Sequence, residues 1–255
     1  MPPGKPLAQS QMPTLRERAY AHIQRKIASG DLKPEASLSE VLLAKELKMS
    51  RTPVREALSQ LVMEGLLEQT QNRGTFVAQF RRHDIVELYE LREALEVYSV
   101  RKAARAELRS IDLQRWQDLC DEILHLKVEL EQSGQPVLTK EQMRRFIASD
   151  LNFHNMLMRL ATNQRMMKVV NDTRLLIRVF GIPRPKYDAP TLGRIHQQHS
   201  AIIQTVVSHD FERAGQLLSE HIRHSLEERL EAYDIWEREN SLQSNVPAFA
   251  DLPHD

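Results

Sequence analysis

The stretch Ser50-Arg-Thr-Pro-Val-Arg-Glu-Ala-Leu58 decides the fold of the first third of this chain. It follows a tight turn at Lys48-Met49-Ser50 and has proline where the first helical turn would lie, so we predict a helix that opens at Arg51. Val54, Leu58 and Leu61 share one face of that helix. Its N-terminal edge and its flank carry polar side chains: Arg51, Thr52, Arg55 and Ser59.

Two further helices are predicted before this one. Thr14-Leu-Arg-Glu17 has the form of a capping box, and the residues that follow repeat an apolar side chain every fourth position: Leu15, Ala19, Ile23 and Ile27. Ser29-Gly30 ends that helix, because glycine is favoured just past a helix C-terminus. Ser39 is a suitable N-cap for a short second helix whose apolar residues are Leu42, Leu43 and Leu47.

A β-hairpin is predicted after the third helix. Residues 66–70 and 75–80 read as short strands on either side of a turn, Gln71-Asn-Arg-Gly74. Three helices followed by a hairpin is the order of a winged helix-turn-helix domain. A helix N-terminus favours phosphate and arginine can grip guanine edges, so this order suits DNA. On spacing alone, a small helical module whose arginines face solvent stays an equal alternative.

The same residues resemble a known family. The first third of the chain is similar to the DNA-binding domain of the GntR superfamily of bacterial regulators. The residues that carry this resemblance are Leu38-Ser-Glu, Leu43-Ala, Leu47, Ser50-Arg-Thr-Pro-Val-Arg-Glu-Ala-Leu58, Leu61, Glu64-Gly-Leu66 and Arg73-Gly-Thr-Phe-Val77. The resemblance covers about 65 residues. It implies that Arg51, Thr52 and Arg55 lie over operator DNA, with Ser59 on the same flank and Arg73 and Gly74 in the wing. Many relatives carry an arginine ten residues before Arg51, where this chain has Val41.

The rest of the chain is expected to be an antiparallel bundle of six helices. From Asp84 onward the sequence shows helical periodicity without a strand pattern, interrupted by Ser133-Gly-Gln-Pro136 and by the proline-rich segment 181–190. Thr139-Lys-Glu-Gln142 is a second capping box. The predicted helices span residues 84–109, 112–132, 140–161, 164–180, 191–208 and 211–239.

Four ligand-type residues lie where this bundle should be apolar. Asp150 and His154 are one helical turn apart on one apolar stripe, and two later histidines, His199 and His221, are flanked by apolar residues in the same way. Buried charges need partners. One carboxylate and three imidazoles suit a divalent ion such as Zn²⁺ or Ni²⁺, with positions left for water or another ligand. Taken singly, a histidine on an apolar face is more often a core residue with satisfied hydrogen bonds.

A cation on the first bundle helix could bind an acid beside that site. Arg92 lies on an apolar stripe with Glu96 one turn later, and its guanidinium could hold a carboxylate in bidentate fashion. We place Arg92, Glu96 and His196 among the residues expected near an effector. His196 and His224 each lie three residues from a proposed ligand. They could replace a ligand or orient one by a hydrogen bond, or they could simply be half-exposed.

This region resembles the effector-binding FCD domain of the FadR branch of the same superfamily. The resemblance rests on Asp84-Ile, Leu91-Arg-Glu-Ala-Leu-Glu96, Asp150-Leu-Asn-Phe-His154, Ala161-Thr-Asn163, His199-Ser-Ala-Ile-Ile203 and Ala214 with His221. Six helices are closer to its smaller, VanR-like variant. The resemblance implies that Asp150, His154, His199 and His221 hold a metal and that Arg92 contacts the carboxylate of a small organic acid.

Composition limits the cellular compartment and the domain organisation that we expect. The 255 residues contain 35 basic and 35 acidic side chains, but residues 1–80 hold 11 basic and 8 acidic ones. One cysteine excludes an internal disulfide, and neither a membrane-spanning run nor a signal-peptide core is found, so we expect a cytoplasmic protein that does not enter membranes. The expected organisation is a loose tail (1–13), a winged helix-turn-helix domain (14–80), a helical effector-binding and dimerisation domain (84–239) and a second loose tail (240–255).

We therefore expect a mainly α protein that regulates transcription and is not an enzyme. It would bind double-stranded operator DNA as a homodimer and respond to a small organic acid at a divalent-metal site. The alternative is a metal-dependent hydrolase or other metalloenzyme built on the aspartate and three histidines. A second alternative is a helical interaction module without a ligand. Neither accounts for Ser50-Arg-Thr-Pro-Val-Arg55.

Overall fold

The computed structural model describes residues 13–70, 73–179 and 185–244. The chain divides into two compact units. The first comprises Met1–Phe80 together with Leu175–Gly181, and the second comprises Arg81–Arg174 together with Ile182–Asp255. Within the described ranges, no helix is both long enough and apolar enough to cross a membrane.

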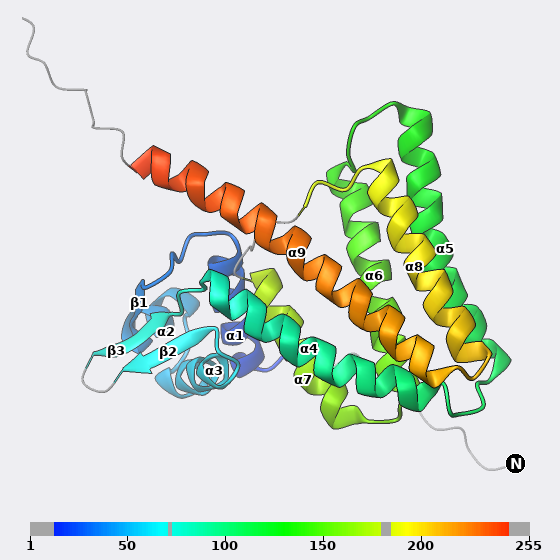
Figure 1. Cartoon of the computed structure of the whole chain (residues 1–255). Helices are drawn as coiled ribbons and strands as arrows, with labels where there is room; N and C mark the ends of the chain where they lie inside the picture. Colours follow the sequence, from blue (N-terminus) through cyan, green and yellow to red (C-terminus); the bar gives the residue numbers. More distant parts are fainter. Residues whose placement is uncertain (1–12, 71–72, 180–184, 245–255) are drawn as a thin grey trace, which may run out of the picture. The chain divides into compact units, whose positions relative to one another are not determined.

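The first unit has the predicted winged helix-turn-helix order. It contains α1 (Leu15–Ala28), β1 (Ser37–Leu38), α2 (Glu40–Leu47), α3 (Arg51–Met63), β2 (Leu67–Thr70) and β3 (Gly74–Val77), coloured blue to cyan in Figure 1. The strands form an antiparallel sheet in the order β1-β3-β2, with Leu38 opposite Thr75 and Leu67 opposite Val77. Strand β1 was not predicted, because two residues are too few to show alternation.

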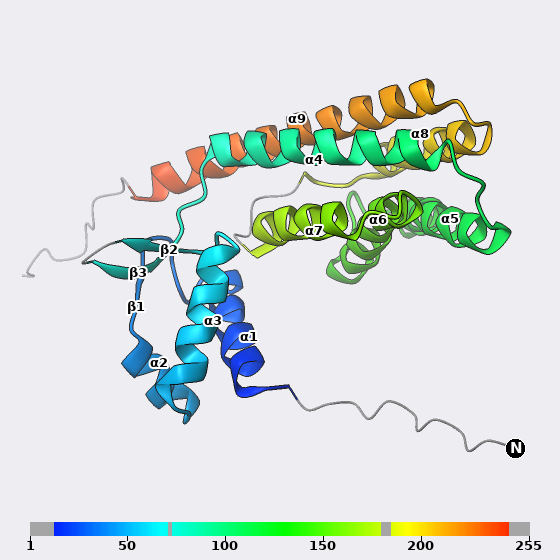
Figure 2. The same ribbon diagram turned by 90° about the horizontal axis from the view of Figure 1, so that it is seen from below.

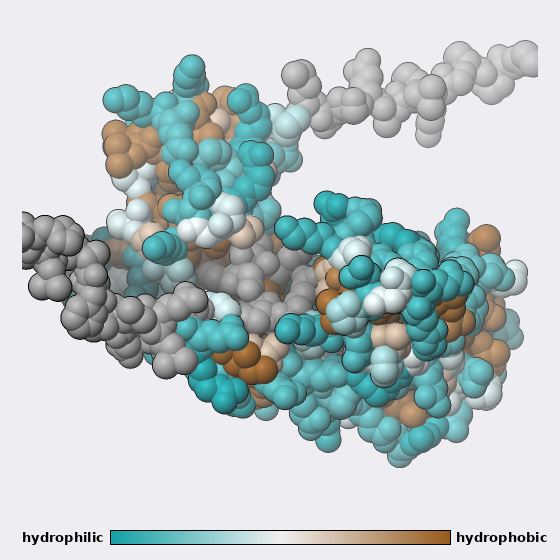
Figure 3. All heavy atoms as spheres, turned by 90° about the horizontal axis from the view of Figure 1, so that it is seen from above, coloured by the Kyte–Doolittle hydropathy of each residue, from teal (hydrophilic) through white to brown (hydrophobic). Residues whose placement is uncertain are grey.

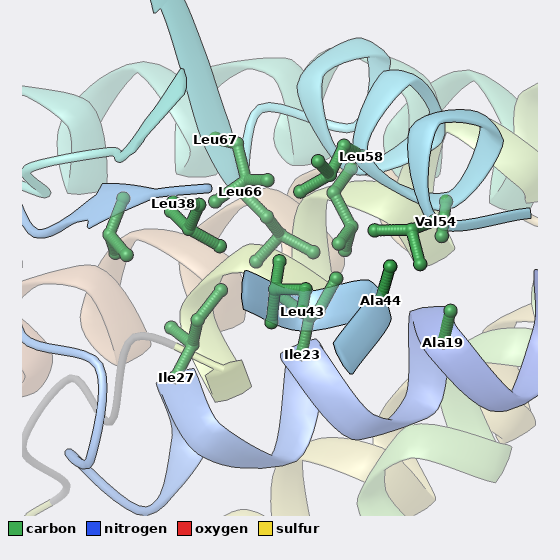
Figure 4. Packing of buried hydrophobic residues seen from close by; sticks show 13 residues of the cluster. Ala19, Ile23, Ile27, Leu38, Leu43, Ala44, Val54, Leu58, Leu66 and Leu67 are labelled. Atoms are coloured by element: carbon green, nitrogen blue, oxygen red, sulfur yellow. The ribbon is translucent and has the colours of Figure 1, made fainter. Parts of the chain in front are cut away.

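The core of the first unit is apolar throughout. Side chains from α1, α2, α3 and β2 point toward one another between the helices (Figure 4), and Ile23, Leu61 and Leu66 are completely buried. Leu175 and Leu176, from the end of helix α7 (Gln164–Val179), also pack against this core. The capping box at Thr14 is confirmed: Thr14 Oγ1 accepts from Glu17 N at 3.2 Å, and Glu17 Oε2 accepts from Thr14 N at 2.8 Å.

The second unit is helical across its described residues. Besides the first part of α7 it contains α4 (Arg82–Ala103), α5 (Ser110–Ser133), α6 (Lys140–Leu160), α8 (Ala189–Val207) and α9 (Phe211–Ser244). Helix α4 lies along α9, and α5 contacts both α6 and α8 (Figures 1 and 2). The predicted fold class, a winged helix-turn-helix domain followed by an antiparallel helical bundle, is confirmed.

Some predicted helix boundaries differ from the observed ones by a few residues. Helix α4 ends at Ala103 rather than at residue 109. After it, Ala104 is completely buried in a turn and the Arg105 guanidinium lies 4.1 Å from the centre of the Phe211 ring. Helix α8 begins at Ala189, two residues before the predicted start, because Asp188 Oδ1 accepts from Thr191 N at 2.9 Å and caps it. Residues 181–184 of the predicted 181–190 connection lie outside the described residues.

Hydrophobic side chains build most of the second core. Trp116 and Phe153 are completely buried with ring centres 5.3 Å apart, and Phe146 packs on Tyr187 at 4.4 Å. On the face shown in Figure 3, hydrophilic residues cover most of the described surface and hydrophobic ones show only in small patches. The second core differs from the first in one respect: it also encloses arginine, glutamate and histidine side chains.

Candidate metal centre and DNA-binding surface

The polar residues of the predicted stripes meet inside the second unit. Helical spacing places Arg92 and Glu96 one turn apart on α4, and Asp150 and His154 one turn apart on α6. Helices α8 and α9 add His199 and His221. Because four helices contribute, only the folded bundle can assemble the cluster.

The four predicted ligands offer their donor atoms to one small volume. One ligand atom each from Asp150, His154, His199 and His221 lies within 4.8 Å of all the others. Nε2 of His199 is 3.3 Å from Nε2 of His221, and Oδ1 of Asp150 is 3.8 Å from Nε2 of both His154 and His199. Ligands around a tetrahedral zinc ion stand about 3.3 Å apart, given bonds near 2.0–2.1 Å, so small side-chain movements would complete a coordination shell.

Hydrogen bonds behind two of the imidazoles orient them. Nδ1 of His154 lies 2.6 Å from Glu96 Oε2, and Nδ1 of His221 lies 2.9 Å from Gln198 Oε1. Because a carboxylate or amide oxygen can only accept, each Nδ1 carries the proton and each Nε2 presents a lone pair to the cluster. The His199 ring is held by stacking on Phe153, with centres 3.6 Å apart, and its buried Nδ1 has no hydrogen-bond partner.

The electrostatics of the cluster favour the protonation states that metal ligands need. Burial lowers the pKa of His199 and of His221 well below the usual range, and neighbouring imidazoles lower each further. Burial lowers the pKa of His154 as well, although Glu96 opposes the shift. Burial alone would raise the pKa of Asp150, but His154 and Arg92 hold it below the ordinary value. Neutral imidazoles around an ionised carboxylate can bind a divalent cation without first losing protons.

Glu96 is the hub of the buried charges. It is completely buried; Oε1 accepts from Arg92 Nε at 2.8 Å and from Arg174 Nη2 at 2.6 Å, while Oε2 accepts from His154. Burial would raise the pKa of this carboxyl, but Arg174 and Arg92 hold it well below its ordinary value. Both oxygens of Glu96 are therefore engaged with other side chains, and its predicted place at an effector stays a prediction.

Arg174 was missed by the sequence analysis. It is buried on α7, where it also donates from Nη1 to Asn155 Oδ1 at 3.3 Å. The signal that identified the other residues was available here, because Arg174 lies among the buried Val170, Thr173 and Ile177.

The Nη2 group of Arg92 does not bind Glu96. It lies 3.0 Å from Nε2 of His154, and therefore faces the same small volume as the ligand atoms. A metal that took the His154 lone pair would leave this N–H group to donate to something else. The predicted contact of Arg92 with an effector carboxylate stays a prediction.

His196 and His224, the two histidines predicted beside the proposed ligands, are not part of this group. His196, expected near the effector, has Nε2 3.9 Å from Asp121 Oδ1 and 3.4 Å from Ser200 Oγ, and it groups with Cys120 and Asp121. His224 is 40% exposed and lies near two glutamates of its own helix.

The first unit presents the predicted DNA-binding residues on α3. Arg51, Thr52, Arg55 and Ser59 are all exposed, whereas Val54 and Leu58 on the opposite face are buried. Glu40 at the start of α2 accepts from Arg51 Nη2 at 3.2 Å and from Arg55 Nη2 at 3.0 Å. It therefore holds two guanidinium groups side by side at the N-terminal end of α3. Val41, next to it, is 56% exposed.

The predicted wing is present as the β2–β3 hairpin. Arg73 and Gly74 are exposed at its end, and Gly74 has φ +100°, a conformation that a residue with a side chain rarely adopts. Gln71 and Asn72 of the predicted turn lie outside the described residues.

Comparison with known proteins identifies both units. Residues 15–77 match the family model described as bacterial regulatory proteins of the gntR family, and residues 87–224 match the FCD domain model. The chain belongs to the GntR family of transcriptional regulators, with an FCD domain. The predicted family and the expectation that the protein is a regulator rather than an enzyme are confirmed.

Individual relatives of this GntR regulator agree with that assignment. The present chain is 31% identical to the Nta operon transcriptional regulator of Aminobacter aminovorans, and the alignment covers 78% of this chain and 87% of the relative. It is 26% identical to the gluconate operon transcriptional repressor of Bacillus licheniformis, covering 76% of each chain. A solved structure, a putative GntR transcriptional regulator from Rhodococcus sp. RHA1, aligns with a TM-score of 0.58 and 26% identity over 86% of this chain and 98% of that one.

Proposed function

We propose that this regulator binds a two-fold-related operator as a homodimer in the cytoplasm, and that a small organic acid bound at a divalent-metal site in the FCD domain modulates the binding. The observation that carries the proposal is the convergence of four ligand atoms within 4.8 Å of one another beside a buried arginine.

The residues present fit a divalent ion. The donor set is one carboxylate and three imidazoles, and the facing nitrogens of His199 and His221 at 3.3 Å already have the separation of two ligands on one ion. The same donor set accepts Zn²⁺ or Ni²⁺, because geometry and availability rather than affinity order select between them. Such an ion would supply a Lewis-acidic centre that a carboxylate oxygen can coordinate.

The residues around the ion define the effector. Arg92 would donate from Nη2 to the second oxygen of an acid while its Nε stays on Glu96. Glu96 and Arg174 act behind these groups by fixing His154 and Arg92 in place. A carboxylate effector is also consistent with a relative named for a gluconate operon, since gluconate is an acid.

DNA recognition would use the exposed face of α3 and the wing. Arg51 and Arg55 are held together by Glu40, which orients both before DNA is met. Thr52 and Ser59 would contact the backbone or base edges beside them, and Arg73 with Gly74 would approach the neighbouring groove or phosphates. A dimer follows from the two-fold symmetry of such operators.

The effector can act only if it binds two states of the protein with different affinity. We propose that these states differ in the placement of the DNA-binding units, with the change absorbed near Phe80–His83, where α4 begins.

The experiment that tests this function measures operator binding in the presence of acids. An operator is first selected from random duplexes with the purified protein, and its affinity is then followed by fluorescence anisotropy while carboxylates and their neutral amides are added. At least one carboxylate should shift the affinity of the metal-loaded wild type but not that of Asp150→Ala/His199→Ala, whose effector-free affinity should be retained. An equal response from the double variant, or an equal response to an amide, would contradict the proposal.

A further inference from the structure

A second group of metal-ligating side chains lies between α5 and α8. It consists of Cys120, Asp121 and His196, whose Sγ, carboxylate oxygen and imidazole nitrogen all lie within 4.8 Å of one another. Nε2 of His196 is 3.9 Å from Asp121 Oδ1. None of these residues belongs to the cluster around Asp150.

A hydroxyl links the thiol to the imidazole. Ser200 Oγ is 3.3 Å from Cys120 Sγ and 3.4 Å from His196 Nε2. His196 and Ser200 are one turn apart on α8, so both face α5 together. The thiol therefore meets two polar side chains from the opposing helix, in a place where packed helices usually present apolar ones.

The group is open to solvent on one side. Cys120 is completely buried, while the side chains of His196 and Asp121 are 22% and 44% exposed. The thiol thus forms the floor of the group, and the imidazole and the carboxylate form its rim. A hydrated cation can reach the rim ligands first and then shed water as it contacts the sulfur.

The chemistry of the three donors selects the kind of cation. A thiolate, an imidazole and a carboxylate together suit a borderline ion such as Zn²⁺ or Co²⁺, whereas Mg²⁺ and Ca²⁺ prefer oxygen donors alone. Donors on a tetrahedral ion are about 3.3 Å apart between nitrogen and oxygen and about 3.6 Å apart where one donor is sulfur, given zinc–sulfur bonds near 2.3 Å and zinc–nitrogen bonds near 2.0 Å. His196 Nε2 and Asp121 Oδ1, at 3.9 Å, exceed this by about 0.6 Å, and the separations from the sulfur, which are within 4.8 Å, exceed it by about 1.2 Å at most. Rotation of the two rim side chains can close these gaps.

A purely structural role for Cys120 would explain the buried thiol but not the imidazole and the carboxylate beside it. The thiol reaches the backbone oxygen of His196 at 3.6 Å, an ordinary distance for a sulfur donor, and lies 3.3 Å from Ser200 Oγ. Those two contacts explain why Cys120 can be buried, but they require neither an imidazole nor a carboxylate beside the sulfur.

We propose that Cys120, Asp121 and His196 form a second divalent-cation site, specific for zinc-like ions, with water or the Ser200 hydroxyl as the fourth donor. Binding displaces the thiol proton to solvent and ties α5 to α8. Because His196 and His199 are one turn apart on α8, one helix would serve both cation sites. The site does not depend on the proposed effector function.

Cobalt spectroscopy of the full chain tests the site, because the chain has one cysteine. The reduced protein, its thiol verified by titration after denaturation, is titrated with Co²⁺ alone. A near-ultraviolet sulfur-to-cobalt charge-transfer band can arise only from Cys120, since the first cluster holds no sulfur. We expect this band in the wild type, its loss in Cys120→Ser, and at least about tenfold weaker Co²⁺ binding at the thiolate in His196→Ala.

Two variants separate this proposal from the first cluster. In Asp150→Ala/His199→Ala the thiolate band should persist; if that variant does not fold, His221→Gln replaces it. The proposal is overturned if saturating Co²⁺ gives visible cobalt absorption without a charge-transfer band in the wild type. It is equally overturned if the band is undiminished in Asp121→Ala/His196→Ala, because the thiol would then bind cobalt without its two neighbours.

Discussion

The two units place their functional groups in opposite ways. Among its described residues the first unit buries only apolar side chains, such as Ile23 and Leu61, in its core, and it presents Arg51 and Arg55 on its surface. The second unit buries Glu96 and its partners at the centre of the bundle. Stability and function are therefore separable in the first unit, whereas in the second unit the groups proposed to bind a ligand also hold the helices together.

The largest expected effect comes from removing the buried hub. Glu96→Ala leaves Arg92 and Arg174 without their shared carboxylate, and loss of one member of a buried ion pair costs about 3–5 kcal/mol of unfolding free energy. Glu93→Ala is a matched control on the same helix, because Glu93 pairs with the exposed Arg223 and should cost about 1 kcal/mol or less. Urea unfolding of both variants measures the difference, and similar losses would remove the distinction between the units.

The next effect separates charge from hydrogen-bond geometry at the pocket. Arg92→Lys keeps the positive charge but loses the planar fork, so it should weaken an acid effector by about tenfold. The neutral amide of that acid should bind both proteins alike. Isothermal titration with an effector found in the anisotropy screen measures this, and an equal loss for acid and amide would assign Arg92 a packing role.

A comparable effect is expected on the surface of the first unit, without a cost in stability. Arg55→Ala should weaken operator binding by at least about tenfold, given about 1–3 kcal/mol for a good base contact, while the unfolding free energy changes little. Arg144→Ala, an exposed arginine of α6, is the control and should bind the operator as the wild type does. Unchanged affinity of Arg55→Ala would take this residue out of the DNA contact.

The smallest effect tests the apolar core. Ile23→Val deletes one methylene from a completely buried side chain and should cost about 0.5–1.5 kcal/mol. Metal content and effector response should be unchanged, because that core contains no ligand. Thermal unfolding and metal analysis check both halves of the expectation; lost metal would show that the two cores are coupled.

The sequence was most informative where a local pattern carries the function. The run from Ser50 to Leu58 predicted α3 and its polar flank, and the spacing of Asp150 and His154 predicted that both face the bundle core. Local spacing defines which face of a helix a residue occupies, so these expectations did not depend on the rest of the chain.

Partners from distant helices could not be predicted in the same way. That Glu96 lies between Arg174 and His154, and that His196 turns toward Cys120 rather than toward His199, depend on how helices pack across long stretches of sequence. The pairing of Glu40 with Arg55 was missed for the same reason. Periodicity identifies a buried polar residue but not the residue that satisfies it.

The most direct test of the account is the metal content of untagged protein purified without chelator. It is measured in a Cys120→Ser background, so that the second proposed site cannot contribute, and compared with the same chain carrying Asp150→Ala/His199→Ala. His224→Ala serves as the control, because that half-exposed imidazole lies one turn from His221. We expect one divalent ion per chain in the parent and the control, and none in the double variant. A folded parent that holds no ion and takes none up on titration with Zn²⁺ or Ni²⁺ would contradict this expectation.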